Sequence, residues 1–124
     1  MKVLILFAMM FCHIVDDYYL QGILASMKQK AWWRKQETYN ENYKYDYIIA
    51  LIMHAFSWAF MIMIPLFIAG SSQIAIVVAI VINAITHAII DDLKANKKSI
   101  NLVQDQTSHL IQVFGTWLIV GLLG

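Results

Sequence analysis

Residues 86–94 read THAIIDDLK and close a long apolar run that begins near Ile74. On a helix, His87, Asp91 and Lys94 stack on one face, because they are spaced four and three residues apart. The apolar run before them is typical of a helix inside a lipid bilayer, where ionisable groups are costly and usually functional. This stretch therefore predicts a membrane helix with a polar stripe, whose partners must come from the rest of the chain.

Composition agrees with a membrane protein. Of the 124 residues, 60% are apolar and 14% are charged, whereas soluble domains average roughly 45–50% apolar and about 25% charged residues. The net charge of +1 gives no reason to expect a nucleic-acid partner. The single cysteine, Cys12, excludes an internal disulfide framework. The length suits one domain, and we expect residues 1–124 to form a single transmembrane domain.

Four apolar segments predict four membrane-spanning helices, at about residues 3–20, 47–69, 74–90 and 108–123. The expected fold is therefore all-α, an integral membrane four-helix bundle. The first segment lacks the small-residue cleavage site of a signal peptide, so we expect it to be retained. Asp16 and Asp92 are each one residue out of phase with the polar stripe of their helix, and we expect them to face the lipid headgroups.

The basic residues predict the orientation. Eight of the nine Lys and Arg residues lie in the connections after the first and third spans, and basic connections favour the cytoplasmic side. Both termini and the turn at 70–73 are then placed on the outer side. The first connection also contains Trp32, Trp33 and several tyrosines, which is typical of a segment at the membrane surface.

This orientation brings the polar stripes to the same depth. Three spans carry a histidine and an aspartate four residues apart near the cytoplasmic end: His13 with Asp17, His87 with Asp91, and Asp105 with His109. His54 lies roughly 10 Å inside the second span at helical rise. Because lipid cannot satisfy such groups, we expect all four stripes to face one another.

Imidazole nitrogens and carboxylate oxygens are typical ligands of zinc and similar divalent ions. A catalytic zinc needs about three protein ligands and an open position for a water molecule that becomes the nucleophile. Simpler explanations stay open. A single His/Asp pair is more often a local hydrogen bond, Asp91 and Lys94 can form an ordinary ion pair, and polar residues can join membrane helices or relay protons.

The spacing of these residues resembles a known family. The motifs are His13-x3-Asp17-Tyr18-x-Leu20-Gln21, a basic residue near Lys28, a lone His54, His87-x3-Asp91-x2-Lys94 and Asp105-Gln106-x2-His109. In this order they resemble a family of small phage and bacterial membrane proteins that is classed as a domain of unknown function. That family is itself similar in pattern to inner-membrane-associated metal-dependent hydrolases. Tyr18 stands where the family usually has Phe.

The resemblance covers nearly the whole chain. It implies a four-helix, metal-binding protein of a bacterial inner (cytoplasmic) membrane, encoded by a bacterium or a phage, and it supplies no substrate.

Two hypotheses follow from the sequence. The first is a membrane-embedded metal-dependent hydrolase that acts on an amphiphile, such as a lipid headgroup, at the cytoplasmic leaflet. Zinc is the expected ion, with His13, Asp17, His87, Asp91 and His109 as its ligands. Asp105 is expected to act as general base or to orient a ligand, His54 as a ligand or proton shuttle, and Lys94, together with Lys28, to face a phosphate or other anion.

The alternative is a non-enzymatic small membrane protein of the phage type. In this hypothesis the His/Asp residues form a polar core that joins the helices or conducts protons, and the protein modifies the envelope or assembles into a homo-oligomer.

Overall fold

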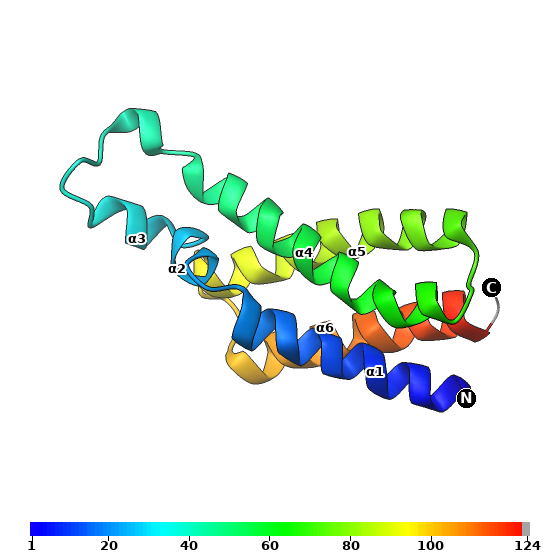
Figure 1. The fold of residues 1–124 in the computed structure, drawn as a ribbon. Coiled ribbons are helices and arrows are strands. Elements are labelled where there is room, and N and C mark those ends of the chain that lie inside the picture. Colours follow the sequence, from blue (N-terminus) through cyan, green and yellow to red (C-terminus); the bar gives the residue numbers. More distant parts are fainter. Residues whose placement is uncertain (123–124) are drawn as a thin grey trace.

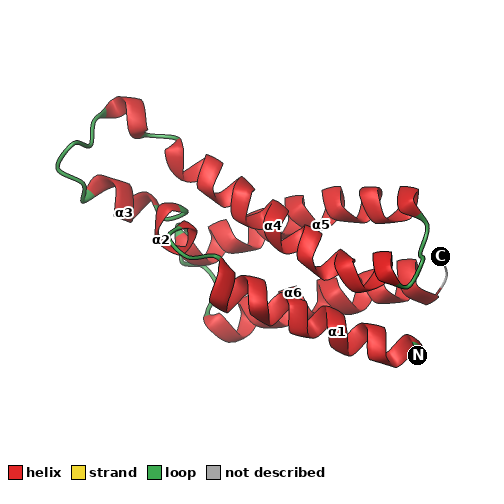
Figure 2. Ribbon diagram, in the orientation of Figure 1, coloured by secondary structure: helices red, strands yellow, loops and turns green. Residues whose placement is uncertain are grey.

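The computed structural model describes residues 1–122, and the regular secondary structure of this part of the chain is all helical (Figures 1 and 2). The all-α expectation is therefore confirmed. The elements in order are α1 (Lys2–Ile14), the π-helix η1 (Val15–Leu20), α2 (Leu24–Met27), α3 (Lys30–Arg34), the 3-10 helix η2 (Glu41–Tyr43), α4 (Asp46–Ile68), α5 (Gln73–Ala95), α6 (Leu102–Thr116) and the π-helix η3 (Trp117–Leu122).

Three helical segments are long and apolar enough to cross a membrane: Lys2–Leu20, Glu41–Ile68 and Gln73–Ala95. They match the first three expected spans, and large apolar side chains are exposed on all of them, such as Phe7, Phe56 and Ile85. Such an apolar surface is unusual for a soluble monomer and favours membrane association.

The fourth expected span, at about 108–123, overlaps α6 and η3, and α6 extends before residue 108. Helix α6 begins at Leu102 because Asn101 and Gln104 form a capping box. The Asn101 side chain accepts a hydrogen bond from the Gln104 backbone amide at 2.9 Å, and the Gln104 side chain accepts one from the Asn101 amide at 3.0 Å. Two otherwise unpaired amides at the helix start are thereby satisfied.

Helix α5 also continues past residue 90, the expected end of the third span, to Ala95. Much of the connection between the third and fourth expected spans is therefore helical. As a result Asp91, Lys94 and Asp105 all lie on regular helices, which hold their side chains in defined directions.

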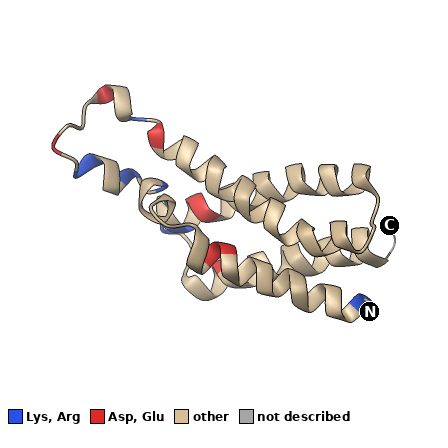
Figure 3. Cartoon of the chain, viewed as in Figure 1, with Lys and Arg blue, Asp and Glu red and all other residues tan. Residues whose placement is uncertain are grey.

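The four long helical segments pack side by side. Helix α4 contacts α1 and α5, and α6 contacts the same two helices. Both described ends of the chain lie at one end of the molecule, and α2 and α3 lie at the other (Figure 1). An apolar core that includes Met9, Trp58, Ile62 and Val113 fills the space between the helices. Lys and Arg residues, except Lys2, gather at the α2–α3 end (Figure 3).

Candidate metal centre

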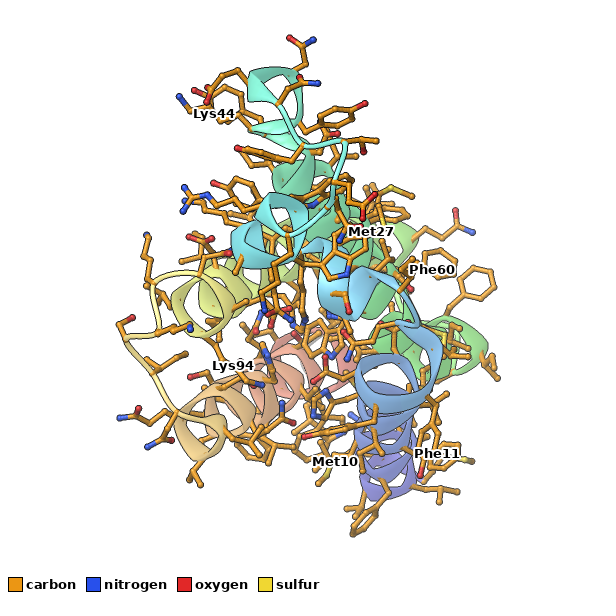
Figure 4. The ribbon with its side chains drawn as sticks, turned by 90° about the vertical axis from the view of Figure 1, so that its left-hand side faces the viewer. Met10, Phe11, Met27, Lys44, Phe60 and Lys94 are labelled. Carbon is orange, nitrogen blue, oxygen red and sulfur yellow. The ribbon has the colours of Figure 1, made fainter. Side chains whose placement is uncertain are left out.

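Each of the four long helical segments contributes one histidine to a single cluster. His13 comes from α1, His54 from α4, His87 from α5 and His109 from α6, and all four are buried. The ring centroids of His87 and His109 are 4.1 Å apart, those of His54 and His87 are 5.1 Å apart, and those of His13 and His109 are 5.9 Å apart. Viewed from the α2–α3 end, side-chain nitrogen and oxygen atoms gather between the helices, near Lys94 (Figure 4).

Three donor atoms form a tight triangle within this cluster. The Nε2 atoms of His54 and His87 are 3.2 Å apart, and Asp91 Oδ2 lies 3.3 Å from the first and 3.6 Å from the second. Atoms bound to one tetrahedral zinc at about 2.0–2.1 Å are themselves separated by about 3.4 Å. The triangle therefore has the dimensions of three ligands that share one ion.

Other donor atoms surround the triangle. Asp17 Oδ1 lies 3.3 Å from His54 Nε2, and His109 Nε2 lies 3.3 Å from both Asp91 Oδ1 and Asp105 Oδ1. Two sets of three residues have ligand atoms that all lie within 4.8 Å of one another: Asp17, His54 and His87, and His87, Asp91 and His109. These buried His/Asp groups can hold a metal ion.

Oxygen atoms lie behind two of the histidine rings, and one of these oxygens is at hydrogen-bond distance. Gln112 Oε1 lies 3.2 Å from His109 Nδ1, and Asp16 Oδ2 lies 3.9 Å from His54 Nδ1. An oxygen on this side of the ring favours a proton on Nδ1 and leaves the lone pair of Nε2 directed into the cluster. His109 is thus arranged as many metal-binding histidines are, whereas the Asp16 carboxylate is too far from His54 Nδ1 for a hydrogen bond and acts on that ring through its charge.

His13 is held differently. Trp58 Nε1 donates a hydrogen bond of 2.8 Å to His13 Nδ1, so the neutral His13 ring carries its proton on Nε2. The Trp58 ring also stacks on His87, with a centroid separation of 4.2 Å and an interplanar angle of 20°. The structure thus places His13 in the cluster, but outside both sets of potential ligands.

Two lysines reach the cluster from the α2–α3 end. Lys28 Nζ lies 2.6 Å from Asp91 Oδ2, and Lys94 Nζ lies 2.8 Å from Asp105 Oδ2. The local pair of Asp91 with Lys94, which spacing alone suggests, is therefore replaced by partners on other segments. Gln106 Nε2 donates to Asp105 Oδ2 at 2.9 Å and to Asp17 Oδ2 at 3.0 Å.

Charge is not balanced by these contacts. Four aspartates of the cluster are buried: Asp16, Asp17, Asp91 and Asp105. Two lysine ammonium groups contact them. When the histidines are neutral, this leaves 4 − 2 = 2 negative charges. An uncompensated buried charge costs several kcal/mol. One divalent cation, or two protons on histidines, would neutralise the cluster.

The expectation for Asp16 was wrong. Its side chain is fully buried, and Ser57 Oγ donates a hydrogen bond of 2.6 Å to it. Residues three and four positions after His13 both lie on the His13 face of a helix. The wider π turn of η1, closed by the hydrogen bond from the Gln21 amide to the Asp16 carbonyl at 3.1 Å, carries both Asp16 and Asp17 at this point. Such π turns are frequent at functional sites.

The sequence interpretation also gave no role to Trp58 or to Gln106. The indole of Trp58 belongs to an apolar helix face, and no short motif marks it as a partner of His13.

Asp92 differs from Asp16, because its carboxylate is partly exposed and pairs with Lys97 at 3.6 Å.

The fold and the site together define an all-helical protein with three helices of membrane-spanning length and composition, built around a buried His/Asp cluster that can hold a metal ion. The chain belongs to the family described as "Protein of unknown function (DUF3307)", whose model matches residues 5–123. Comparisons with curated proteins and with solved structures found no significant match. The family agrees with the resemblance noted from the motifs, at the level of a domain of unknown function.

Proposed function

We propose that this protein is a membrane-embedded metal-dependent hydrolase that acts on an amphiphile with an anionic headgroup at the cytoplasmic leaflet of a bacterial inner membrane. The triangle of His54 Nε2, His87 Nε2 and Asp91 Oδ2 carries the proposal, since its sides of 3.2, 3.3 and 3.6 Å match ligands around one ion. Zinc suits this mixture of imidazole and carboxylate best.

The membrane part of the proposal rests on surface and charge. We place the four long helical segments across the bilayer as a four-helix bundle, with their exposed apolar side chains against lipid. The α2–α3 end carries eight of the nine Lys and Arg residues and is therefore assigned to the cytoplasm (Figure 3). The His/Asp cluster then lies just below the inner membrane surface.

The residues of the cluster divide into roles. Asp17, His54, His87, Asp91 and His109 offer atoms directed inward, so we assign the ligands from this set. When bound, zinc supplies a Lewis acid and a water molecule that ionises near neutral pH. Asp105 Oδ1 is buried and has no hydrogen-bond partner, so it is placed to accept a proton from such a water.

The remaining members of the predicted site act around the ligands. His13, held by Trp58, supports the stacked rings of His87 and His109. The side chain of Lys94 is 39% exposed, which places its ammonium group between the cluster and the outside. There it can attract an anionic headgroup.

The arm that precedes α4 supports an amphiphilic substrate. A small pocket between α3, η2 and the start of α4 is lined by basic and aromatic side chains, among them Lys30, Arg34, Lys44 and Trp33. The ring of Trp33 stacks on that of Tyr43, with an interplanar angle of 15°. Basic and aromatic residues of this kind suit the interface between lipid headgroups and water.

Elemental analysis of the purified protein tests the metal. We expect one zinc per chain in the wild type and none in a His54→Ala/His87→Ala double variant, because two corners of the triangle are removed. Asp92→Asn is the matched control, since Asp92 neighbours Asp91 but pairs outside the cluster, and it should keep its zinc. Wild-type protein that binds no divalent metal would refute the proposal. Release of headgroup from phospholipid vesicles, lost in the same double variant, tests the hydrolase activity.

One observation favours a second candidate, a polar core that binds or relays protons. His54 and His109 each lie between two carboxylates, at 3.3 Å from both. Two protons on these rings would also neutralise the cluster. In that case Asp17→Asn, Asp91→Asn and His109→Gln should alter assembly or pH-dependent proton flux, whereas the hydrolase proposal expects correct assembly with loss of activity and metal.

A further inference from the structure

We infer that the cluster contains a second divalent cation site, formed by His109, Asp91 and Asp105 and joined to the first site by the Asp91 carboxylate. The inference deepens the proposed function and rests on it. It further assigns the class of substrate, an ester of phosphate, for the reason of charge given below.

The proposed second site has donor atoms in place, and Asp105 Oδ1, the proton acceptor when one ion is bound, becomes a ligand when the second ion binds. His109 Nε2 lies 3.3 Å from Asp91 Oδ1 and 3.3 Å from Asp105 Oδ1. Both His109 Nε2 and Asp105 Oδ1 are buried, and neither has a well-formed hydrogen bond. Buried polar atoms nearly always have a hydrogen-bond or metal partner. Two such atoms that face each other without a hydrogen bond therefore indicate that a shared partner, such as a cation, binds both of them.

Asp91 connects the two sites through its two oxygens. Oδ2 belongs to the triangle with His54 and His87, whereas Oδ1 faces His109. A carboxylate shared in this way is suited to hold two ions at the separation of about 3.5–4 Å found in two-metal hydrolytic sites.

Contacts at the rim direct the outer carboxylates inward. Gln106 Nε2 donates to the Oδ2 atoms of both Asp17 and Asp105, and Lys94 Nζ also contacts the Oδ2 atom of Asp105. The Oδ1 atoms therefore remain directed at the cluster, that of Asp17 at His54 and that of Asp105 at His109. Carboxylates and imidazoles therefore alternate in one row, in the order Asp17, His54, Asp91, His109 and Asp105.

Charge decides when the second site fills. The cluster has two uncompensated negative charges, and the first divalent ion neutralises them. A second ion adds two positive charges that the described residues around the cluster do not balance. The second ion should therefore bind together with an anion, and the phosphate group of a substrate, with a hydroxide, supplies the required charge.

Equilibrium dialysis of the detergent-solubilised full chain against Mn²⁺, with and without inorganic phosphate, tests the inference. We expect one ion per chain without phosphate and two with it, and an electron paramagnetic resonance spectrum typical of coupled Mn²⁺ pairs only in the second case. Asp105→Asn should bind one ion under both conditions, because only the second site loses a ligand. The control Asp92→Asn should behave as the wild type.

The outcomes separate this inference from the proposed function. Wild-type protein that stays at one ion in saturating Mn²⁺ and phosphate would overturn the second site and leave the first intact. Protein that binds no ion would overturn the proposed function itself. Two coupled ions in Asp105→Asn would show that the second ion lies elsewhere. Should that variant fail to fold, His109→Gln and the wild-type titration still decide.

Discussion

Asp91 is the residue through which most of the candidate site is connected. Its two oxygens lie 3.3 Å from His54, 3.6 Å from His87, 3.3 Å from His109 and 2.6 Å from Lys28. These four partners come from α4, α5, α6 and the segment after α2. A single buried carboxylate therefore joins four parts of the chain, and its cost of burial is offset by the cations and donors around it.

Asp16 should act through His54 without binding the ion. We expect Asp16→Asn to lower zinc affinity roughly tenfold, the lower end of the effect of removing a partner of a ligand histidine, because Asp16 acts on His54 through charge without a hydrogen bond. The carboxylate that stabilises a proton on His54 Nδ1 is lost, while the size of the side chain is retained. Competition with a zinc-binding dye in detergent measures the change. Unaltered affinity would show that the 3.9 Å contact has no influence on His54.

Lys28 competes with a cation for Asp91 Oδ2. We expect Lys28→Leu to raise zinc affinity by roughly tenfold or more, because a hydrogen bond to a charged group contributes about 1.5–3 kcal/mol and no longer has to be broken. Without metal the same variant should unfold more readily, since the uncompensated charge rises to 4 − 1 = 3. Zinc titration and thermal unfolding in a chelator check both effects. Lys35→Leu, on the exposed arm, is the control, and equal affinities would contradict the prediction.

At the scale of elements, two local features decide which side chains enter the cluster. The π turn of η1 places Asp16 and Asp17 together, and the capping box at Asn101 begins α6 early enough to include Asp105. Both features lie next to the candidate site. Helix ends and widened turns are set by single hydrogen bonds, which hydrophobic periodicity does not record.

The capping box should be measurable in stability. We expect Asn101→Ala to lower the free energy of unfolding by about 0.5–2 kcal/mol, because the Gln104 amide loses its acceptor. Asn101→Asp retains an oxygen at this position and should stay close to the wild type. Denaturant unfolding of the detergent-solubilised wild type and the two variants measures their free energies of unfolding. Equal stability of the Ala and Asp variants would mean that the first turn of α6 is held by packing alone.

At the scale of the whole molecule, the distribution of charge and the position of the cluster agree. Lys and Arg, except Lys2, gather at the α2–α3 end, and the lysines that pair with the buried aspartates lie at the same end (Figure 3). The apolar core with Trp58, Ile62 and Leu66 extends toward the other end. This asymmetry supports the proposal that the cluster opens toward the cytoplasm.

The proposed orientation can be tested in intact bacterial cells. In a Cys12→Ala background, a membrane-impermeant maleimide should label Gln73→Cys, at the first residue of α5, from outside the inner membrane. Lys35→Cys, on the arm, should be labelled only after the membrane is permeabilised, because basic segments stay in the cytoplasm. Both positions are exposed in the structure, so access to the reagent depends on the side of the membrane alone. The reverse pattern would invert the proposed orientation.

The sequence by itself determined the apolar helices and most of their inward faces. His13, His87, Asp91, Asp105 and His109 all lie on the stripes that helical spacing predicted, and all are buried. These inward faces could be predicted from the sequence because the spacing of residues on a helix is a local property of the chain. Zinc, the reaction and the substrate remain predictions.

Only the tertiary structure decided which atoms meet. Lys28 reaches Asp91 rather than a neighbour in sequence, Gln106 joins Asp17 to Asp105, and Trp58 occupies Nδ1 of His13. These contacts connect different helices, so they depend on how each helix is rotated and packed against the others. A local spacing rule contains no such information, and for this reason the distinction between ligand and supporting residue appears only when the four helical segments are assembled.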